Sequence, residues 1–278
     1  MVTRSLKSRV GATLFGLVAE LRWQVYQRTC PLIRAGLESN TASNLLYSFL
    51  ISRRYRYVYV DNPKTGCSSL KSALVELEVK DRPSGIGARD WQFFHDPLVS
   101  PLKRISDPRR GMSLSALTKE NYRFITFVRN PYTRLCSCYR DKIMGNKPQK
   151  RAILRLLGYS GHPIETPVSF EEFAKAVTGQ SDREMDNHWR VQSSQILYGI
   201  VEYSFVGRFE EYVADWVECF RRLGFSGNSI PESRHFNRTK AGEAEYCDKY
   251  YTKELQDLIY RRYKKDFDNF GYAYELPR

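Results

Sequence analysis

The hydrophobic pattern of the chain alternates between helical spacing and short apolar runs. Apolar residues recur every three or four positions near the N-terminus, which predicts an amphipathic helical segment over residues 1–54. Runs of β-branched and aromatic residues, which favour strands, occupy residues 55–60, 122–128 and 201–207. Helical spacing follows each run, and we expect a last helix over residues 253–270.

This order of strands and helices determines the expected fold class. Strands that alternate with helices are typical of α/β proteins with a parallel sheet. We therefore predict an α/β, P-loop-like three-layer domain, with a central parallel sheet flanked by helices, over residues 55–278. Residues 1–54 would form an N-terminal helical segment packed on it. A chain of 278 residues is long enough to bury one substantial core.

The N-terminal segment shows some features of a targeting sequence. Basic residues precede the uncharged run 10–19, which Glu20 and Arg22 end. This run is too short to cross a bilayer, which takes about 20 apolar residues. Its glycines, and the lack of a small-residue cleavage site after it, disfavour a signal peptide. We expect a helix that packs on the domain or associates peripherally with a membrane, in a cytoplasmic protein.

Charge and cysteine content narrow the class of protein. The formal net charge of +13 favours an anionic partner through long-range attraction. Six cysteines with no CxxC spacing indicate neither a disulfide framework nor a structural zinc site. Cys136 and Cys138 are two positions apart on a predicted helix and therefore point to different sides. We expect reduced cysteines and no metal.

The stretch YVDNPKTGCSSLKSALVELE, residues 59–78, predicts a strand, a turn of small residues and a helix. Free amides and the helix dipole stabilise an anion at such a turn. Lys64 supplies charge, and Gly66 lets the backbone approach a ligand closely. Three hydroxyl groups complete the set of donors, those of Thr65, Ser68 and Ser69. The lysine precedes the glycine, so the Walker A pattern is absent, and a plain strand–helix turn remains an alternative.

A second motif, FVRNPYTRLCSCYRDK, covers residues 127–142. Arg129 follows a predicted strand, and Ser137 lies eight residues later on the next helix, which places both at the ligand-binding edge of a parallel sheet. An arginine can bind phosphate as a bidentate hydrogen-bond donor. We interpret Arg134 and Arg140 as solvated or ion-paired charges on the helix.

Together, PKTGCSSLK and FVRNPYTRLCSCYRDK resemble the two nucleotide-binding signatures of the carbohydrate sulfotransferases of the HNK-1 and chondroitin 4-O type. Those enzymes use 3′-phosphoadenosine 5′-phosphosulfate (PAPS). Four further segments match the family in the same order: DNHWRVQ at 186–192, SFVGRFE at 204–210, HFNRT at 235–239 and RYKKDFDNFGY at 262–272. The resemblance covers residues 55 to 273.

The resemblance implies roles for individual residues. The segment from Lys64 to Lys71, which includes Cys67, would hold the 5′-phosphosulfate, and Arg129 with Ser137 would hold the 3′-phosphate. The HFNRT segment resembles a late loop that closes over the nucleotide. It adds three candidate nucleotide-binding residues, Asn237, Arg238 and Thr239.

Sulfuryl transfer to a hydroxyl group also needs a general base, and histidine suits that role near neutral pH. His95 lies between the two motifs, where many sulfotransferases of this fold carry their base, and is the first candidate. His188 is the second, with pocket shaping as its alternative role. A carboxylate, Asp96 or Glu76, is the third possibility. Lys64 would stabilise the charge on the leaving phosphate.

The remaining aromatic and histidine residues fit two explanations. Four aromatic rings could stack on a sugar acceptor, but packing in the hydrophobic core explains them equally well. They are the rings of Trp91, Phe93, Phe94 and Trp189. His162 and His235 are expected to be ordinary surface or nucleotide-proximal histidines. Two departures from the family stand out. Val191 replaces the usual proline, and the membrane anchor of Golgi members is missing, which favours a cytoplasmic enzyme.

We predict a sulfotransferase that moves a sulfuryl group from PAPS to a hydroxyl group, or an amine, of a carbohydrate or other hydroxylated acceptor. Transfer would be direct and in line, with a general base and no metal. One alternative is an ATP-dependent P-loop kinase of a small molecule, which the missing Walker A lysine disfavours. Another is a basic RNA-binding protein, but no RRM or KH pattern is present, and no nucleic-acid partner is expected.

Overall fold

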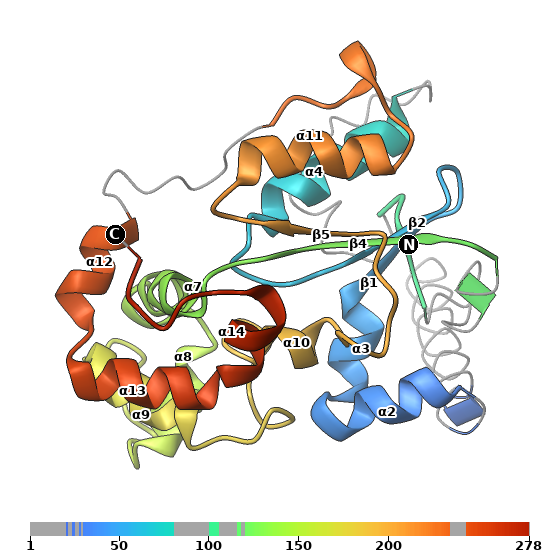
Figure 1. Cartoon of the computed structure of the whole chain (residues 1–278). Coiled ribbons are helices and arrows are strands. Elements are labelled where there is room, and N and C mark those ends of the chain that lie inside the picture. The colour runs from blue at the N-terminus through green and yellow to red at the C-terminus, as the bar shows by residue number, and fades with distance from the viewer. Residues whose placement is uncertain are drawn as a thin grey trace, which may run out of the picture.

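The computed structural model describes residues 30–80, 100–105, 116–117, 120–233 and 243–277, together with residues 21, 24, 25 and 28. Its centre is a five-stranded sheet in the order β3-β1-β2-β4-β5 (Figure 1). The strands are β1 (Phe49–Ser52), β2 (Tyr57–Val60), β3 (Lys103–Arg104), β4 (Arg123–Val128) and β5 (Phe205–Arg208). β2, β4 and β5 are parallel, whereas β1 is antiparallel to both of its neighbours.

Helices cover both faces of the sheet, which gives the three layers that the pattern predicts (Figure 1). α4 (Cys67–Val79) and α11 (Tyr212–Arg222) lie on one face, where Tyr57 and Tyr59 of β2 point. Val58 and Val60 point to the opposite face. That face is covered by α2 (Pro31–Ser39), α3 (Ala42–Ser48), α10 (Gln192–Gln195) and α14 (Lys264–Phe270). β2 is thus buried on both sides.

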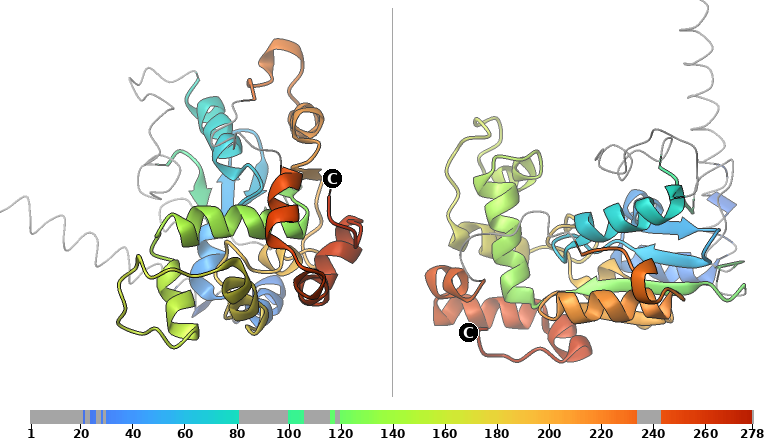
Figure 2. Two further views of the ribbon diagram at one scale, coloured as in Figure 1. Left: turned by 90° about the vertical axis from the view of Figure 1, so that its left-hand side faces the viewer. Right: turned by 90° about the horizontal axis from the view of Figure 1, so that it is seen from above.

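A group of helices lies beside the sheet and has its own apolar core (Figure 2). It contains α7 (Pro131–Cys138), the π-helix η1 (Tyr139–Met144), α8 (Lys150–Leu156), α9 (Phe170–Thr178), α12 (Glu243–Tyr250) and α13 (Lys253–Arg262). A short 3-10 helix, η2 (Gly227–Ser229), follows α11. Asn130 caps α7 through its side chain, and Pro131 is its first residue, so the helix begins directly at the end of β4.

Most of the expected elements are present, with three differences. The segment expected to be helical up to residue 54 contains β1, so that expectation is wrong for Phe49–Ser52. The last helix is broken at Tyr263 into α13 and α14. The strand expected over 201–207 begins only at Phe205. Short apolar runs cannot be assigned to a helix or a strand by spacing alone, which explains β1.

Among the described residues, no helix is long and apolar enough to cross a membrane. All six cysteines are free thiols, including Cys136 and Cys138, as expected from their spacing.

Candidate active site

The turn between β2 and α4 has an unusual backbone. Gly66 has a φ of 80°, and a Cβ atom there would lie 2.6 Å from a ring carbon of Tyr212. The Tyr212 hydroxyl donates a hydrogen bond of 3.1 Å to the Gly66 carbonyl. Glycine is therefore required by both conformation and space. The backbone of Lys64 is also in the left-handed region, with a φ of 74°, which few non-glycine residues adopt.

The N-terminus of α4 opens into a cavity of about 990 Å³. No side chain caps this helix, so its first amides are available to an anion. Six sequence-predicted site residues from the turn and from α7 line the cavity together: Lys64, Gly66, Cys67, Ser68, Ser69 and Ser137. Arg129, at the end of β4, lines it as well. The structure thus brings the two sequence motifs to one place.

Arg129 is held firmly at the edge of this cavity. Its Nε donates to the Thr133 hydroxyl at 3.1 Å, and its Nη1 donates to the Lys64 carbonyl at 3.0 Å. The guanidinium carbon lies 4.4 Å from the ring centre of Phe209, a cation–π contact. Because these contacts fix the guanidinium plane, Arg129 presents a pre-oriented positive charge to the cavity.

Two residues of the turn make internal contacts. The Thr65 hydroxyl donates to the Asn62 carbonyl at 2.7 Å, and Thr65 is buried and does not line the cavity. Lys71 lines the cavity, but its ammonium forms a buried ion pair of 2.6 Å with Asp61. Although burial alone would lower the pKa of Lys71, the Asp61 carboxylate raises it. These two side chains therefore stabilise the turn itself.

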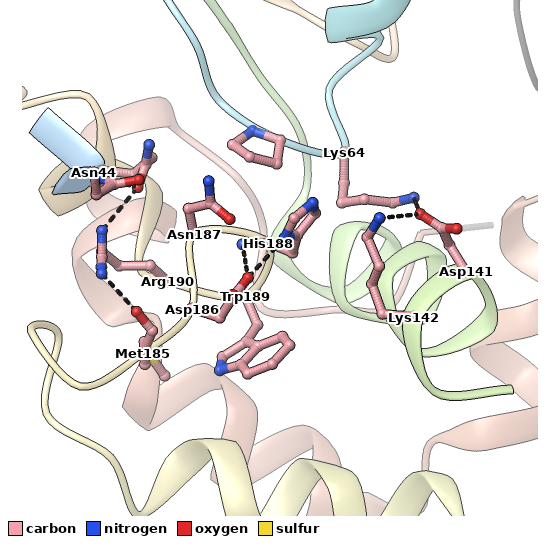
Figure 3. Close-up of polar contacts among 12 residues, drawn as sticks. Asn44, Lys64, Asp141, Lys142, Met185, Asp186, Asn187, His188, Trp189 and Arg190 are labelled. Carbon is pink, nitrogen blue, oxygen red and sulfur yellow. Dashed lines mark hydrogen bonds and ion pairs between the residues drawn. The ribbon is translucent and has the colours of Figure 1, made fainter. Parts of the chain in front are cut away.

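The Lys64 ammonium lies 2.8 Å from Oδ2 of Asp141 on η1. The same oxygen lies 3.2 Å from the ammonium of Lys142 (Figure 3). The sequence analysis did not single out Asp141, although it stands inside the second motif.

His188 lines the cavity close to Lys64 (Figure 3). Its Nδ1 lies 2.6 Å from Oδ1 of Asp186, and its backbone amide donates to the same oxygen at 2.9 Å. Burial lowers the pKa of His188; the Asp186 carboxylate opposes this effect, and the positive charges of Lys142 and Lys64 add to it. A neutral imidazole, held through Nδ1, keeps Nε2 for another partner.

The interpretation of Arg134 as a solvated or ion-paired charge on the helix is wrong. Arg134 is 2% exposed and is neither solvated nor paired with a carboxylate. Its guanidinium donates to three carbonyl oxygens, those of Pro63 at 3.0 Å, Arg190 at 2.8 Å and Asn187 at 3.1 Å. One side chain therefore ties the turn that carries Lys64 to the loop that carries His188.

Other candidates have different outcomes. Glu76 on α4 does not line the cavity, so it is not positioned as a base. Trp189 is 1% exposed, and its indole donates to Gln180, so it belongs to the core and is unavailable to stack on a sugar. His162 is exposed, as expected. Val191 has a φ of −50°, which a proline would also accept, so the backbone at this position is compatible with the family's proline.

Nine residues from the sequence analysis lie outside the described residues, so their predicted roles stay predictions. They are Trp91, Phe93, Phe94, His95, Asp96, His235, Asn237, Arg238 and Thr239.

The sequence analysis missed the side of the cavity that α3 forms. Thr41, Ser43, Asn44 and Tyr47 line this side. The Asn44 side chain donates a hydrogen bond of 2.9 Å to Gln195, which lies 151 positions later in the sequence. No local sequence pattern predicts such a contact. Within the described ranges, no group of three or more His, Cys, Asp or Glu residues is arranged to hold a metal ion.

Comparisons with known proteins agree with the site. The profile of the sulfotransferase family (Sulfotransfer_2) matches residues 47–273. Carbohydrate sulfotransferase 14 of Homo sapiens is 28% identical over 251 residues, which are 84% of this chain and 61% of that protein. Carbohydrate sulfotransferase 8 of Mus musculus is 27% identical over 275 residues, 91% of this chain and 63% of that protein.

Carbohydrate sulfotransferase 10 of Rattus norvegicus is 25% identical over 278 residues, 89% of this chain and 76% of that protein. No solved structure matches the chain. The chain spans about three fifths of the length of the human and mouse relatives. Because the family profile covers most of the chain, including both cavity-forming motifs, the protein belongs to the sulfotransferase family.

Proposed function

We propose that this protein transfers a sulfuryl group from PAPS to a hydroxyl group of a carbohydrate or similar acceptor. The observation that carries the proposal is the convergence of the uncapped α4 N-terminus, Lys64, Arg129 and His188 on one cavity. Family membership and relatives named carbohydrate sulfotransferases support the reaction class. An amine is the alternative acceptor group.

The residues present fit a doubly phosphorylated nucleotide. The first-turn amides of α4 and the Lys64 ammonium would hold the phosphosulfate end. Arg129 and Ser137 would hold the 3′-phosphate, which distinguishes this donor from ATP. PAPS supplies an activated sulfuryl group on a phosphate leaving group. Lys64 would then stabilise the negative charge that develops on that phosphate.

His188 is the described residue best placed to act as general base. The Asp186 contact at Nδ1 fixes the ring, so Nε2 would take the proton of the acceptor hydroxyl. The acceptor oxygen forms the new S–O bond as the S–O bond to the leaving phosphate breaks. The lowered pKa of His188 favours the neutral imidazole that a general base requires. His95 remains the other candidate, predicted from its position in the sequence.

Nucleotide binding tests the donor assignment. We expect calorimetry to show binding of 3′-phosphoadenosine 5′-phosphate (PAP) and much weaker binding of ADP. Arg129→Ala should weaken PAP binding by roughly 2 to 4 kcal/mol, as expected when a positioned charge is removed from an ion pair. Preference for ADP would favour a kinase, and binding of RNA alone would favour the RNA-binding alternative.

A second experiment separates the two candidate bases. We expect His188→Ala to lower the turnover number by about 10² to 10⁴, with PAP affinity close to that of the parent at a pH above the pKa of His188. Asp186→Asn should lower turnover by a smaller factor, because the imidazole is retained but is no longer held in one tautomer. If His95→Ala lowers turnover this much and His188→Ala does not, His95 is the base.

A further inference from the structure

Three charged side chains meet in the cavity, on the side where the proposed function places the phosphosulfate end of PAPS. Oδ2 of Asp141 accepts from the ammonium groups of Lys64 at 2.8 Å and Lys142 at 3.2 Å (Figure 3). Both lysine side chains are less than one fifth exposed, whereas Asp141 is 38% exposed. Burial alone would raise the pKa of Asp141, but the hydrogen bond and charge of Lys64, with those of Lys142, lower it. Asp141 is therefore a carboxylate at neutral pH.

The position of Asp141 follows from the helix that carries it. α7 continues into the π-helix η1, whose wider turn changes which side chains face the cavity. Ser137 on α7 and Asp141 on η1 both line the cavity. Lys64 approaches from the opposite side, from the turn before α4. The ion pair thus joins the two motifs at the point where the proposed function places the leaving phosphate.

Without this carboxylate, the ammonium groups of Lys64 and Lys142, which share one oxygen of Asp141, would face each other. Like charges at such short range repel strongly when they are partly buried. A negative charge at this point therefore offsets the repulsion between the two lysines. When a nucleotide brings phosphate groups of its own, a fixed carboxylate at the same place repels them.

We propose that Asp141 is a built-in counter-ion that pairs with Lys64 before the nucleotide binds, in place of the leaving phosphate, and gives up Lys64 when the nucleotide enters. The inference rests on the proposed function. It makes Asp141 a positioning residue, since it holds the Lys64 ammonium at the cavity before the donor arrives. It also predicts that Asp141 weakens nucleotide binding and speeds release of the product PAP.

The test is the affinity and dissociation rate of PAP for Asp141→Asn, by calorimetry and stopped flow. We expect PAP to bind about 5- to 20-fold more tightly, mainly through slower dissociation, and the gain to shrink as salt concentration rises. Asp268→Asn is the matched control. It removes the same charge at an exposed i,i+4 pair with Lys264, and PAP affinity should not change.

In Asp141→Asn two lysines face each other, and their repulsion could itself disturb the fold. The same substitution is therefore also made in a Lys142→Gln background, and this double variant is compared with Lys142→Gln alone. PAP should bind more tightly in this background too. Affinity that is equal or weaker after loss of the carboxylate, in whichever background folds, overturns the inference, since Asp141 would then assist the bound state. Failure of the parent to bind PAP refutes the proposed function instead, so the two failures are distinguishable.

Discussion

Replacing Arg134 by methionine tests whether the geometry of the site depends on one buried guanidinium. Methionine has a similar length and can fill the space, so the main loss is polar. The carbonyl oxygens of Pro63, Asn187 and Arg190 would each lose a donor at 2.8–3.1 Å, the first and last in buried positions and that of Asn187 in a partly buried one.

The magnitude follows from these contacts. A hydrogen bond from a charged donor contributes about 1.5–3 kcal/mol, so three bonds set an upper range of roughly 5–9 kcal/mol. Burial lowers the pKa of Arg134, which shows that the charge itself is costly to desolvate. Removing the charge offsets part of the loss. We expect Arg134→Met to lower the free energy of unfolding by about 2–4 kcal/mol.

Denaturant unfolding followed by circular dichroism measures this change. Arg155→Met, at an exposed arginine on α8, is the control and should change stability by less than about 1 kcal/mol. Turnover of Arg134→Met should fall at least tenfold at temperatures where it is folded, because Lys64 and His188 lose their common anchor. A variant as stable and as active as the parent would refute the view that Arg134 joins the two halves of the site.

Three further changes have clear expected outcomes. Lys71→Met should destabilise the fold by about 3–5 kcal/mol, because Asp61 is left buried and unpaired, and addition of Asp61→Asn should restore much of the loss in thermal unfolding. Bound PAP adds negative charge and should raise the pKa of His188, so PAP affinity should fall as pH rises through that pKa. Calorimetry in two buffers should then show proton uptake on binding, which His188→Gln should abolish. Turnover should persist in EDTA, and a loss of activity that Mg²⁺ restores would favour the kinase alternative.

The strand–turn–helix of residues 59–78 was predictable because all of its signals are local. An apolar run, a small-residue turn and helical spacing follow one another within 20 residues. The start of the helix after Arg129 was predictable for the same reason, since Asn130 and Pro131 specify a helix N-terminus.

The remaining parts of the site depend on contacts between distant segments. Arg134 has the spacing of a surface charge, and only the packing of Asn187 and Pro63 around it shows that it is buried. Asn44, which lines the cavity, donates a hydrogen bond to Gln195, a residue 151 positions away in the sequence. Sequence spacing contains no information on such contacts, so the side of the cavity that α3 forms was not predictable.

The left-handed backbone of Lys64 has a consequence for directed evolution. A lysine in this conformation costs of order 1 kcal/mol relative to glycine. Screening a library for heat resistance alone would therefore enrich glycine or asparagine at this position and discard the ammonium. Variants recovered that way would be more thermostable but would have lost the proposed sulfuryl-transfer activity. A thermostabilisation campaign on this scaffold should hold position 64 constant and search elsewhere.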